Sequence, residues 1–184
     1  MVKTVPISKE SKKQISKSRK IQSHGGIDYK SNIDKAHKEL RKHMNYTRVL
    51  RWPKSNLFLK MESEQVSGSF KARGGGYKLI SLTEEQRKAG ITTASSGNQG
   101  GGVSLMAKKL GIPMTCYVPL NASVAKIAKI RDNGALIEEV PGDRNKCEIK
   151  ARKDAGELGQ IYVSPYNDPV VVAGQGTVGK EIYE

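Results

Sequence analysis

The amino-acid sequence predicts an α/β fold with a three-layer, open parallel sheet that carries helices on its faces. The first observation is that short apolar runs alternate with helical patterns of ten or more residues between residues 90 and 165. This alternation is typical of strand–helix–strand units, which join parallel strands by right-handed crossovers. The second is that residues 61–184 carry 16 basic and 14 acidic side chains, the nearly neutral balance of a globular body.

The predicted elements follow one another along the chain. A helix is expected over residues 27–45, because Ile33, Ala36, Leu40 and Met44 recur at spacings of three and four. Strands are expected at 56–62, 90–95, 114–120, 135–140 and 160–165, and helices at 69–82, 96–111, 123–134, 143–159 and 170–184.

The N-terminal third holds nearly all of the net charge. Residues 1–60 contain 16 Lys and Arg but 4 Asp and Glu, so +12 of the total +14 lies there. For residues 1–26 two interpretations stay open, a solvated disordered tail and a basic arm that docks on an acidic surface. Residues 1–45 have little apolar surface, so we expect any order in them to come from an acidic partner.

Several function classes are excluded by composition. The three histidines lie at positions 24, 37 and 43, so the body can form neither a Ser-His-Asp site nor a His-ligated metal site. Cys116 and Cys147 make no disulfide framework, and Cys116 is expected to be a buried apolar residue in a reducing compartment. No stretch of 18 apolar residues and no signal-peptide pattern is visible.

Two glycine-rich stretches could contact a ligand. "GQGTVG" (174–179) matches a dinucleotide fingerprint but lacks the acidic residue needed about 20 positions later, and Glu181 stands where a phosphate loop needs Ser or Thr. "SSGNQGGG" (95–102) is the stronger candidate, because it follows a predicted strand and begins a predicted helix. Ligands of open α/β sheets bind there, although a tight structural turn is the alternative.

Four motifs together resemble one enzyme family. "SGSFKARG" (67–74), "ASSGNQG" (94–100), "LGIP" (110–113) and "PYNDPVVVAGQGTVGKEI" (165–182) occur in the order and spacing of the serine/threonine dehydratases and serine racemases. These are pyridoxal-phosphate (PLP) enzymes of fold type II, the tryptophan-synthase-β-like fold. The resemblance runs from about residue 56 to residue 184.

The resemblance implies a role for each matched residue. Lys71 matches the lysine whose ε-amine binds the cofactor aldehyde, Phe70 shapes its turn, and Asn98 would hydrogen-bond the cofactor's 3′-oxygen. Ser96 also matches the second acid/base of racemases. The substrate carboxylate would be held by Ser95, Ser96, Gly97, Asn98 and Gln99. A lysine freed from the cofactor can take the α-proton of the amino acid, and no metal is implied in this part of the chain.

The sequence departs from the family pattern at several places. Thr47-Arg48 stands where the family has Thr-Pro, and Gln99 stands where it has His. The family's four-glycine phosphate loop comes after the matched region. We therefore expect this chain to be an N-terminal part that is inactive alone and holds its cofactor weakly.

The family's architecture implies a division of the chain. Residues 1–45 would be a basic arm, partly helical; 46–89 the first elements of the larger domain with the lysine helix; 90–169 the small α/β domain; and 170–184 the start of the return into the larger domain.

The sequence therefore leaves two functions open. The first is a PLP-dependent serine/threonine ammonia-lyase or racemase, cytoplasmic and part of an oligomer. The second is a non-catalytic subunit of a larger assembly, beside a microtubule or cilium or in a ribonucleoprotein, docked through residues 1–45. Lysine-rich charge with few aromatics argues against a nucleic-acid reader.

Overall fold

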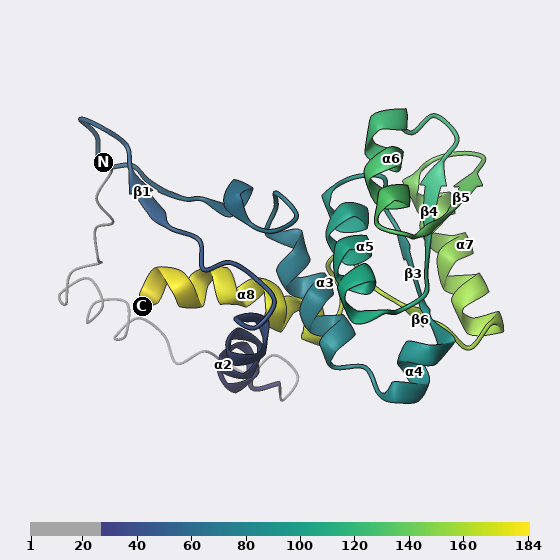
Figure 1. The fold of residues 1–184 in the computed structure, drawn as a ribbon, viewed down its shortest axis with the longest axis horizontal. Coiled ribbons are helices and arrows are strands. Elements are labelled where there is room, and N and C mark those ends of the chain that lie inside the picture. Colours follow the sequence, from purple (N-terminus) through teal and green to yellow (C-terminus); the bar gives the residue numbers. More distant parts are fainter. Residues whose placement is uncertain (1–26) are drawn as a thin grey trace.

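A four-stranded parallel sheet forms the centre of the body. The computed structural model describes residues 27–184, and it orders the strands β5-β4-β3-β6 with every neighbouring pair parallel (Figure 1). The strands are β3 (Ile91–Ala94), β4 (Met114–Pro119), β5 (Leu136–Val140) and β6 (Ile161–Tyr162). The predicted open parallel α/β sheet is thus confirmed.

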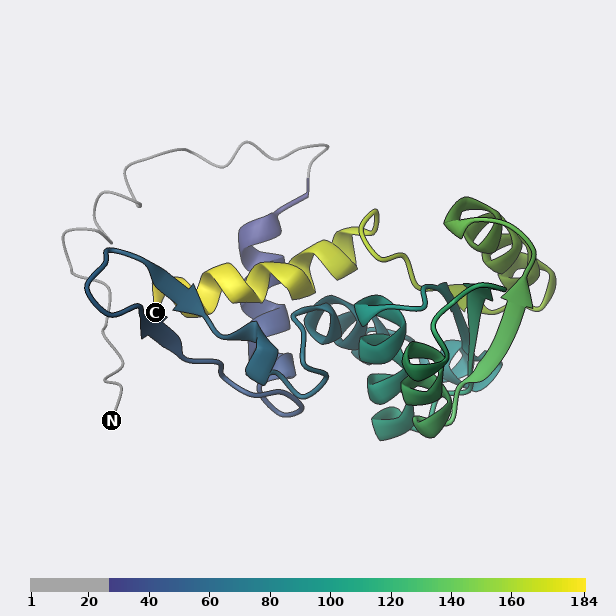
Figure 2. The ribbon, with the colours of Figure 1, turned by 90° about the horizontal axis from the view of Figure 1, so that it is seen from above.

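Helices cover both faces of this sheet. On one face, α5 (Asn98–Leu110) and α6 (Val124–Asp132) pack against the strands, and α7 (Arg144–Glu157) covers the other (Figure 2). The pleat of β4 explains the division, because alternate residues of a strand point to opposite faces. Met114, Cys116 and Val118 enter the core beneath α5 and α6, whereas Tyr117 packs on the side of α7.

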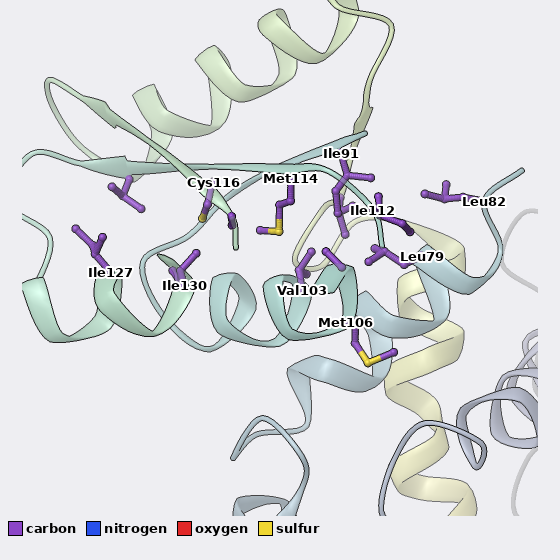
Figure 3. Packing of buried hydrophobic residues seen from close by; sticks show 14 residues of the cluster. Leu79, Leu82, Ile91, Val103, Met106, Ile112, Met114, Cys116, Ile127 and Ile130 are labelled. Carbon is purple, nitrogen blue, oxygen red and sulfur yellow. The ribbon is translucent and has the colours of Figure 1, made fainter. Parts of the chain in front are cut away.

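The core between the sheet and α5 is apolar and closed to solvent. Val103 from α5 faces Ile91 and Met114 from the strands, with Ile130 of α6 on the same side of the sheet (Figure 3). Met106 points from the opposite side of α5 and packs against Gly76. All five side chains are at most 5 % exposed. Burial of each contributes about 1.5–3 kcal/mol, which fixes α5, and with it the loop before α5, on the sheet.

A second group of helices lies beside the sheet. Helix α3 (Lys71–Ile80) packs between α5 and α8 (Pro169–Tyr183), and α2 (Tyr29–Leu40) packs on α8 (Figure 1). The short helix α4 (Glu84–Ala89) connects α3 to β3. A hairpin of β1 (Val49–Arg51) and β2 (Phe58–Lys60) leads into the 3₁₀ turn η2 (Glu62–Glu64).

The order of residues 29–40 has an internal cause. Ala36 and Leu40 of α2 are buried, and Lys180 of α8 forms an ion pair with Asp34 at 2.9 Å. The expectation that an acidic partner must order residues up to 45 is therefore wrong for this helix, because α8 supplies the apolar surface. The basic residues 1–26 lie outside the described residues.

Candidate functional site

The turn before α3 is held by hydrogen bonds to its own hydroxyls. The Ser69 hydroxyl oxygen accepts the backbone N–H of Lys71 at 3.2 Å, and the Ser67 hydroxyl donates to the Ser69 carbonyl at 3.0 Å. From α6, the ammonium of Lys129 donates to the Ser67 carbonyl at 2.9 Å. This turn therefore fixes Lys71 as the first residue of α3.

The Lys71 amine is half-buried and meets a neutral acceptor. Its Nζ donates to the carbonyl oxygen of Pro165 at 2.8 Å and lies 5.3 Å from the centroid of the exposed Phe70 ring. Burial, and secondarily the positive charge of Arg144, lower the pKa of Lys71. A lowered pKa increases the fraction of free amine, the form that attacks an aldehyde carbon.

The loop after β3 is anchored by the strand beside it. The Cys116 thiol donates to the Ser95 carbonyl at 3.1 Å, and the Ser95 hydroxyl oxygen accepts the N–H of Gly97 at 3.2 Å. Burial raises the pKa of Cys116 to about 12, so the thiol keeps the proton that it donates. Cys116 is fully buried, as the sequence predicted.

The amino end of α5 offers donors to an anion. Gly97 is its N-cap and provides no side-chain capping bond, so the first N–H groups of the helix lack that partner. A Cβ placed on Gly97 would meet nothing nearer than the Ser95 hydroxyl oxygen, at 3.9 Å. Asn98 is exposed and Ser96 half-buried. An uncapped helix start with open space beside it suits a carboxylate.

Lys71 and Gln99 donate hydrogen bonds to two consecutive backbone carbonyls. The buried Gln99 donates through Nε2 to the Ser164 carbonyl at 3.5 Å, next to the Pro165 carbonyl that receives Lys71. Both acceptors closely follow β6, and Ser95 directly follows β3, so the site lies at the carboxyl edge of the sheet. Ligands of open α/β sheets bind at that edge.

Several glycines of "SSGNQGGG" serve packing rather than ligand access, which corrects part of the sequence interpretation. A Cβ on Gly102 would lie 2.8 Å from the backbone nitrogen of Ala72, and one on Gly100 would lie 2.1 Å from the Ser95 carbonyl oxygen. These glycines let α5 approach α3 and its own preceding loop. Gly97, at the end of that loop, borders open space instead.

The "GQGTVG" stretch lies inside α8, after its first turn. A phosphate loop requires a strand-to-helix turn, which this geometry excludes for these residues. A Cβ on Gly174 would lie 2.6 Å from the Arg73 carbonyl oxygen, so this glycine allows α8 to pack closely on α3.

A buried ionic network beside the site was not foreseen from the sequence. The fully buried guanidinium of Arg73 donates to Glu181 of α8 at 2.6 and 2.9 Å and to Glu62 of η2 at 2.8 Å through two nitrogens. The Lys60 ammonium joins Glu181 at 2.6 Å, and the Thr47 hydroxyl donates to Glu62 at 2.6 Å. The partners lie far apart in the chain, so no local pattern reveals them.

Other features of the described residues offer no second site. No group of three or more His, Cys, Asp or Glu side chains within residues 27–184 is placed to hold a metal ion. None of the helices in the described part of the chain has the length and apolar character needed to cross a bilayer. A cavity of about 220 Å³ lies at the opposite, amino edge of the sheet, lined by Ser104, Lys108 and Asn133 among others. These three side chains are already hydrogen-bonded to one another or to backbone carbonyls.

The carboxyl edge of this open parallel sheet holds a half-buried lysine and an uncapped helix start. This is the arrangement of a small-molecule-binding α/β protein. Comparison with known proteins identifies the group more closely. A model of the pyridoxal-phosphate dependent enzyme family matches residues 40–184, and the chain belongs to this family.

Curated relatives are named for reactions of threonine. The chain is 43 % identical over 128 residues to an L-threonine ammonia-lyase of Thermotoga maritima, covering 70 % of this chain and 32 % of that protein. It is likewise 43 % identical over 131 residues to a catabolic L-threonine dehydratase of Staphylococcus aureus, covering 71 % and 38 %. The chain thus spans about a third of the length of these relatives.

Solved structures share the fold. Maize serine racemase superposes with a TM-score of 0.78 at 30 % identity, covering 82 % of this chain and 48 % of that one. The serine racemase of Dictyostelium discoideum gives a TM-score of 0.77 at 30 % identity, covering 82 % and 51 %. These matches confirm the predicted family and the fold-type-II α/β architecture.

Proposed function

We propose that this chain contributes the reactive lysine and the substrate loop of a PLP-dependent ammonia-lyase or racemase that acts on serine or threonine. The observation that carries the proposal is the Lys71 amine, half-buried with a lowered pKa and held by a neutral carbonyl next to the one that Gln99 meets. The relatives, two enzymes named for threonine and a serine racemase, support the substrate class.

The residues of this chain fit one end of the cofactor. Lys71 offers an amine of the right nucleophilicity to an aldehyde, and the uncapped start of α5 offers N–H donors to a carboxylate. When bound, PLP supplies an electron sink that makes the α-proton of an amino acid acidic and lets a β-hydroxyl leave.

Each candidate residue has a proposed task. Lys71 would hold the cofactor aldehyde and, once freed from it, would move the α-proton of the amino acid at its Nζ, and Asn98 would orient the cofactor by a hydrogen bond. Phe70 lies against the amine and limits water there. In a racemase reaction the Ser96 hydroxyl exchanges the proton on the opposite face. The amino-acid carboxylate is held by the loop Ser95, Ser96, Gly97, Asn98 and Gln99.

Activity is proposed to need more than the matched region. The relatives extend well beyond the part that aligns with this chain, so we infer that the cofactor phosphate and ring nitrogen are held by residues outside it. The chain by itself would bind PLP weakly, and an oligomer in the cytosol is the proposed working form. The two buried, unpaired cysteines support a reducing compartment.

Cofactor attachment tests the proposal directly. The full chain is incubated with PLP, reduced with borohydride, and mapped by peptide mass spectrometry. Lys71 is expected to carry most of the label, Lys71→Ala to lose it, and Lys88→Ala, an exposed lysine paired with Glu84, to keep it. Label spread evenly over the lysines, or unchanged by Lys71→Ala, would refute the proposal.

A further inference from the structure

Three consecutive backbone carbonyls after β6 receive side chains from three different elements. Val163 accepts from the Thr93 hydroxyl of β3 at 2.8 Å, and Ser164 from the Gln99 amide of α5 at 3.5 Å. Pro165 accepts from the Lys71 ammonium of α3 at 2.8 Å.

The backbone ladder ends within this segment, so its carbonyls need hydrogen-bond donors from side chains. The backbone ladder ends at the N–H of Val163, which donates to the Thr92 carbonyl at 2.8 Å. Pro165 has no N–H and restricts the backbone of Ser164, so a regular strand stops here. Val163 and Ser164 are buried, and buried carbonyls require partners. The N–H of Val163 is thus held by the neighbouring strand, whereas the three carbonyls that follow are held by side chains.

Thr93 is the firmest of the three anchors. Its side chain is fully buried in β3, one of the two inner strands of the sheet and the one that pairs with β6, and its bond to Val163 is short and buried. Gln99 adds a longer contact one residue on. Its Nε2 faces the Ser164 carbonyl, and its Oε1 is buried without a partner in the described part of the chain. Among residues 27–184, Ser164 is therefore the group that orients the amide.

The far end of the segment is fastened to α3. Asp168 caps α8 by accepting the N–H of Val170 at 2.8 Å, and it pairs with Lys78 of α3 at 2.7 Å. Between these fastenings lies the Pro165 carbonyl, whose position is set from the sheet side by Thr93 and Gln99.

We propose that Thr93 and Gln99 are positioning residues for Lys71. They hold the segment 163–165 so that the Pro165 carbonyl keeps the lysine amine beside the 95–99 loop. The catalytic meaning of this contact rests on the proposed function, whereas the contact itself requires no cofactor. Neither side chain takes part in proton transfer in this scheme.

The hydrogen bond can be observed directly by nuclear magnetic resonance. In the full chain labelled with ¹⁵N and ¹³C, a long-range correlation across the hydrogen bond should join Lys71 Nζ to the Pro165 carbonyl carbon. Thr93→Val removes the hydroxyl with little change of shape, and Thr93→Ser keeps it. The matched control is Thr92→Val. Thr92 is equally buried on the same strand, but its hydroxyl donates to the Ala151 carbonyl of α7 at 3.2 Å.

The expected pattern separates positioning from general loss of stability. Wild type, Thr93→Ser and Thr92→Val keep the Lys71–Pro165 correlation, whereas Thr93→Val loses it, although both valine variants lower the melting temperature comparably. Gln99→Met removes the amide without leaving a buried polar atom, and it should weaken the same correlation. This second variant keeps the proposal testable if Thr93→Val does not fold.

Several outcomes would overturn the proposal. These are absence of the correlation in wild type, its persistence in both Thr93→Val and Gln99→Met, or its loss in Thr92→Val as well. The mapped rate of PLP attachment gives a separate readout, expected to fall in Thr93→Val and not in Thr92→Val. If wild type shows the correlation but Lys71 takes no PLP, the proposed function fails while the positioning role stands.

Discussion

Two cations in the first turn of α3 have opposite environments. Lys71 meets a backbone carbonyl and has a lowered pKa, whereas Arg73 is enclosed by two carboxylates. An amine that must react is better held by a neutral acceptor, because a carboxylate would stabilise its protonated form. Arg73 takes the opposite role and ties α3 to η2 and α8.

Replacing Arg73 should be strongly destabilising. In Arg73→Met the carboxylates of Glu62 and Glu181 stay buried without their partner, which typically lowers the free energy of unfolding by about 3–5 kcal/mol. Arg48→Met is the control. Arg48 also donates through two nitrogens to one carboxylate, that of Glu64, but both side chains are largely exposed. Its loss should change the urea unfolding midpoint little, because solvent screens an exposed ion pair. Equal losses in the two variants would contradict a special role for the buried network.

Stability should depend on acid through Glu181. Burial alone would raise the pKa of this carboxyl, but hydrogen bonds from Arg73 and Lys60 hold it below its usual 4.5. A carboxyl with a lowered folded-state pKa stabilises the fold above its ordinary value, and this contribution is lost as the pH falls through the folded value. The stability difference between wild type and Glu181→Gln should therefore be largest near neutral pH and shrink towards pH 3 in urea titrations. A difference that stays constant with pH would contradict this.

At the scale of elements, the helix bounds could be predicted because they depend on signals within each helix. The helices at 71–80, 98–110, 124–132 and 144–157 begin and end within about two residues of their expected bounds, because caps and apolar spacing define them. Helix α4 was missed although Thr83 and Gln86 form a capping box that its sequence displays.

Strands were harder to predict because a strand forms only where a neighbouring strand pairs with it. β1 has three residues and exists through its pairing with β2 across a turn, which no periodicity reveals. β6 was expected over 160–165 but ends at Tyr162, because Pro165 and the carbonyls before it leave the ladder. The site followed the same rule. The family resemblance indicated Lys71 and the 95–99 loop, while Thr93, Arg73 and Glu181 depend on contacts between distant segments.

The contact between α3 and α5 should not tolerate a methyl group at Gly102. A Cβ there would lie 2.8 Å from the Ala72 nitrogen, so Gly102→Ala should separate the helices and lower the free energy of unfolding by about 1–3 kcal/mol. Gly101→Ala is the matched control on the same helix, since its Cβ would meet only Lys129 Cδ at 4.0 Å. It should be neutral or stabilising by up to about 1 kcal/mol. If chemical denaturation gives both variants the same stability, the close approach of the two helices is not limiting.

At the scale of the whole molecule, α3 connects two groups of elements. Figure 1 shows α3 between α8 and the elements around the sheet. Its Lys71 bonds to Pro165 after β6, and its Arg73 pairs with Glu181 of α8 and Glu62 of η2, so one helix couples the candidate site to the rest of the fold. Because Lys71 and Arg73 lie in the same turn of α3, a substitution that displaces either group of elements should also displace the Lys71 amine.

The uneven charge leads to a last prediction about the whole chain. Residues 1–26 hold 7 basic and 1 acidic side chain, and exposed charge of one sign binds an acidic surface in a salt-sensitive way, because screening acts within about 8–10 Å at physiological ionic strength. The test compares two glutamine variants of the full chain with equal net charge on immobilised polyglutamate. The arm variant changes Lys12, Lys13, Lys17, Arg19 and Lys20. The body variant changes five exposed lysines, Lys54, Lys88, Lys126, Lys146 and Lys153. If the arm is a docking segment, the arm variant should elute at clearly lower salt than the body variant, since clustered charges on one segment can contact the same surface together. Elution of both variants at the same salt would mean that only total charge matters, and the interpretation of residues 1–26 as a solvated tail would hold.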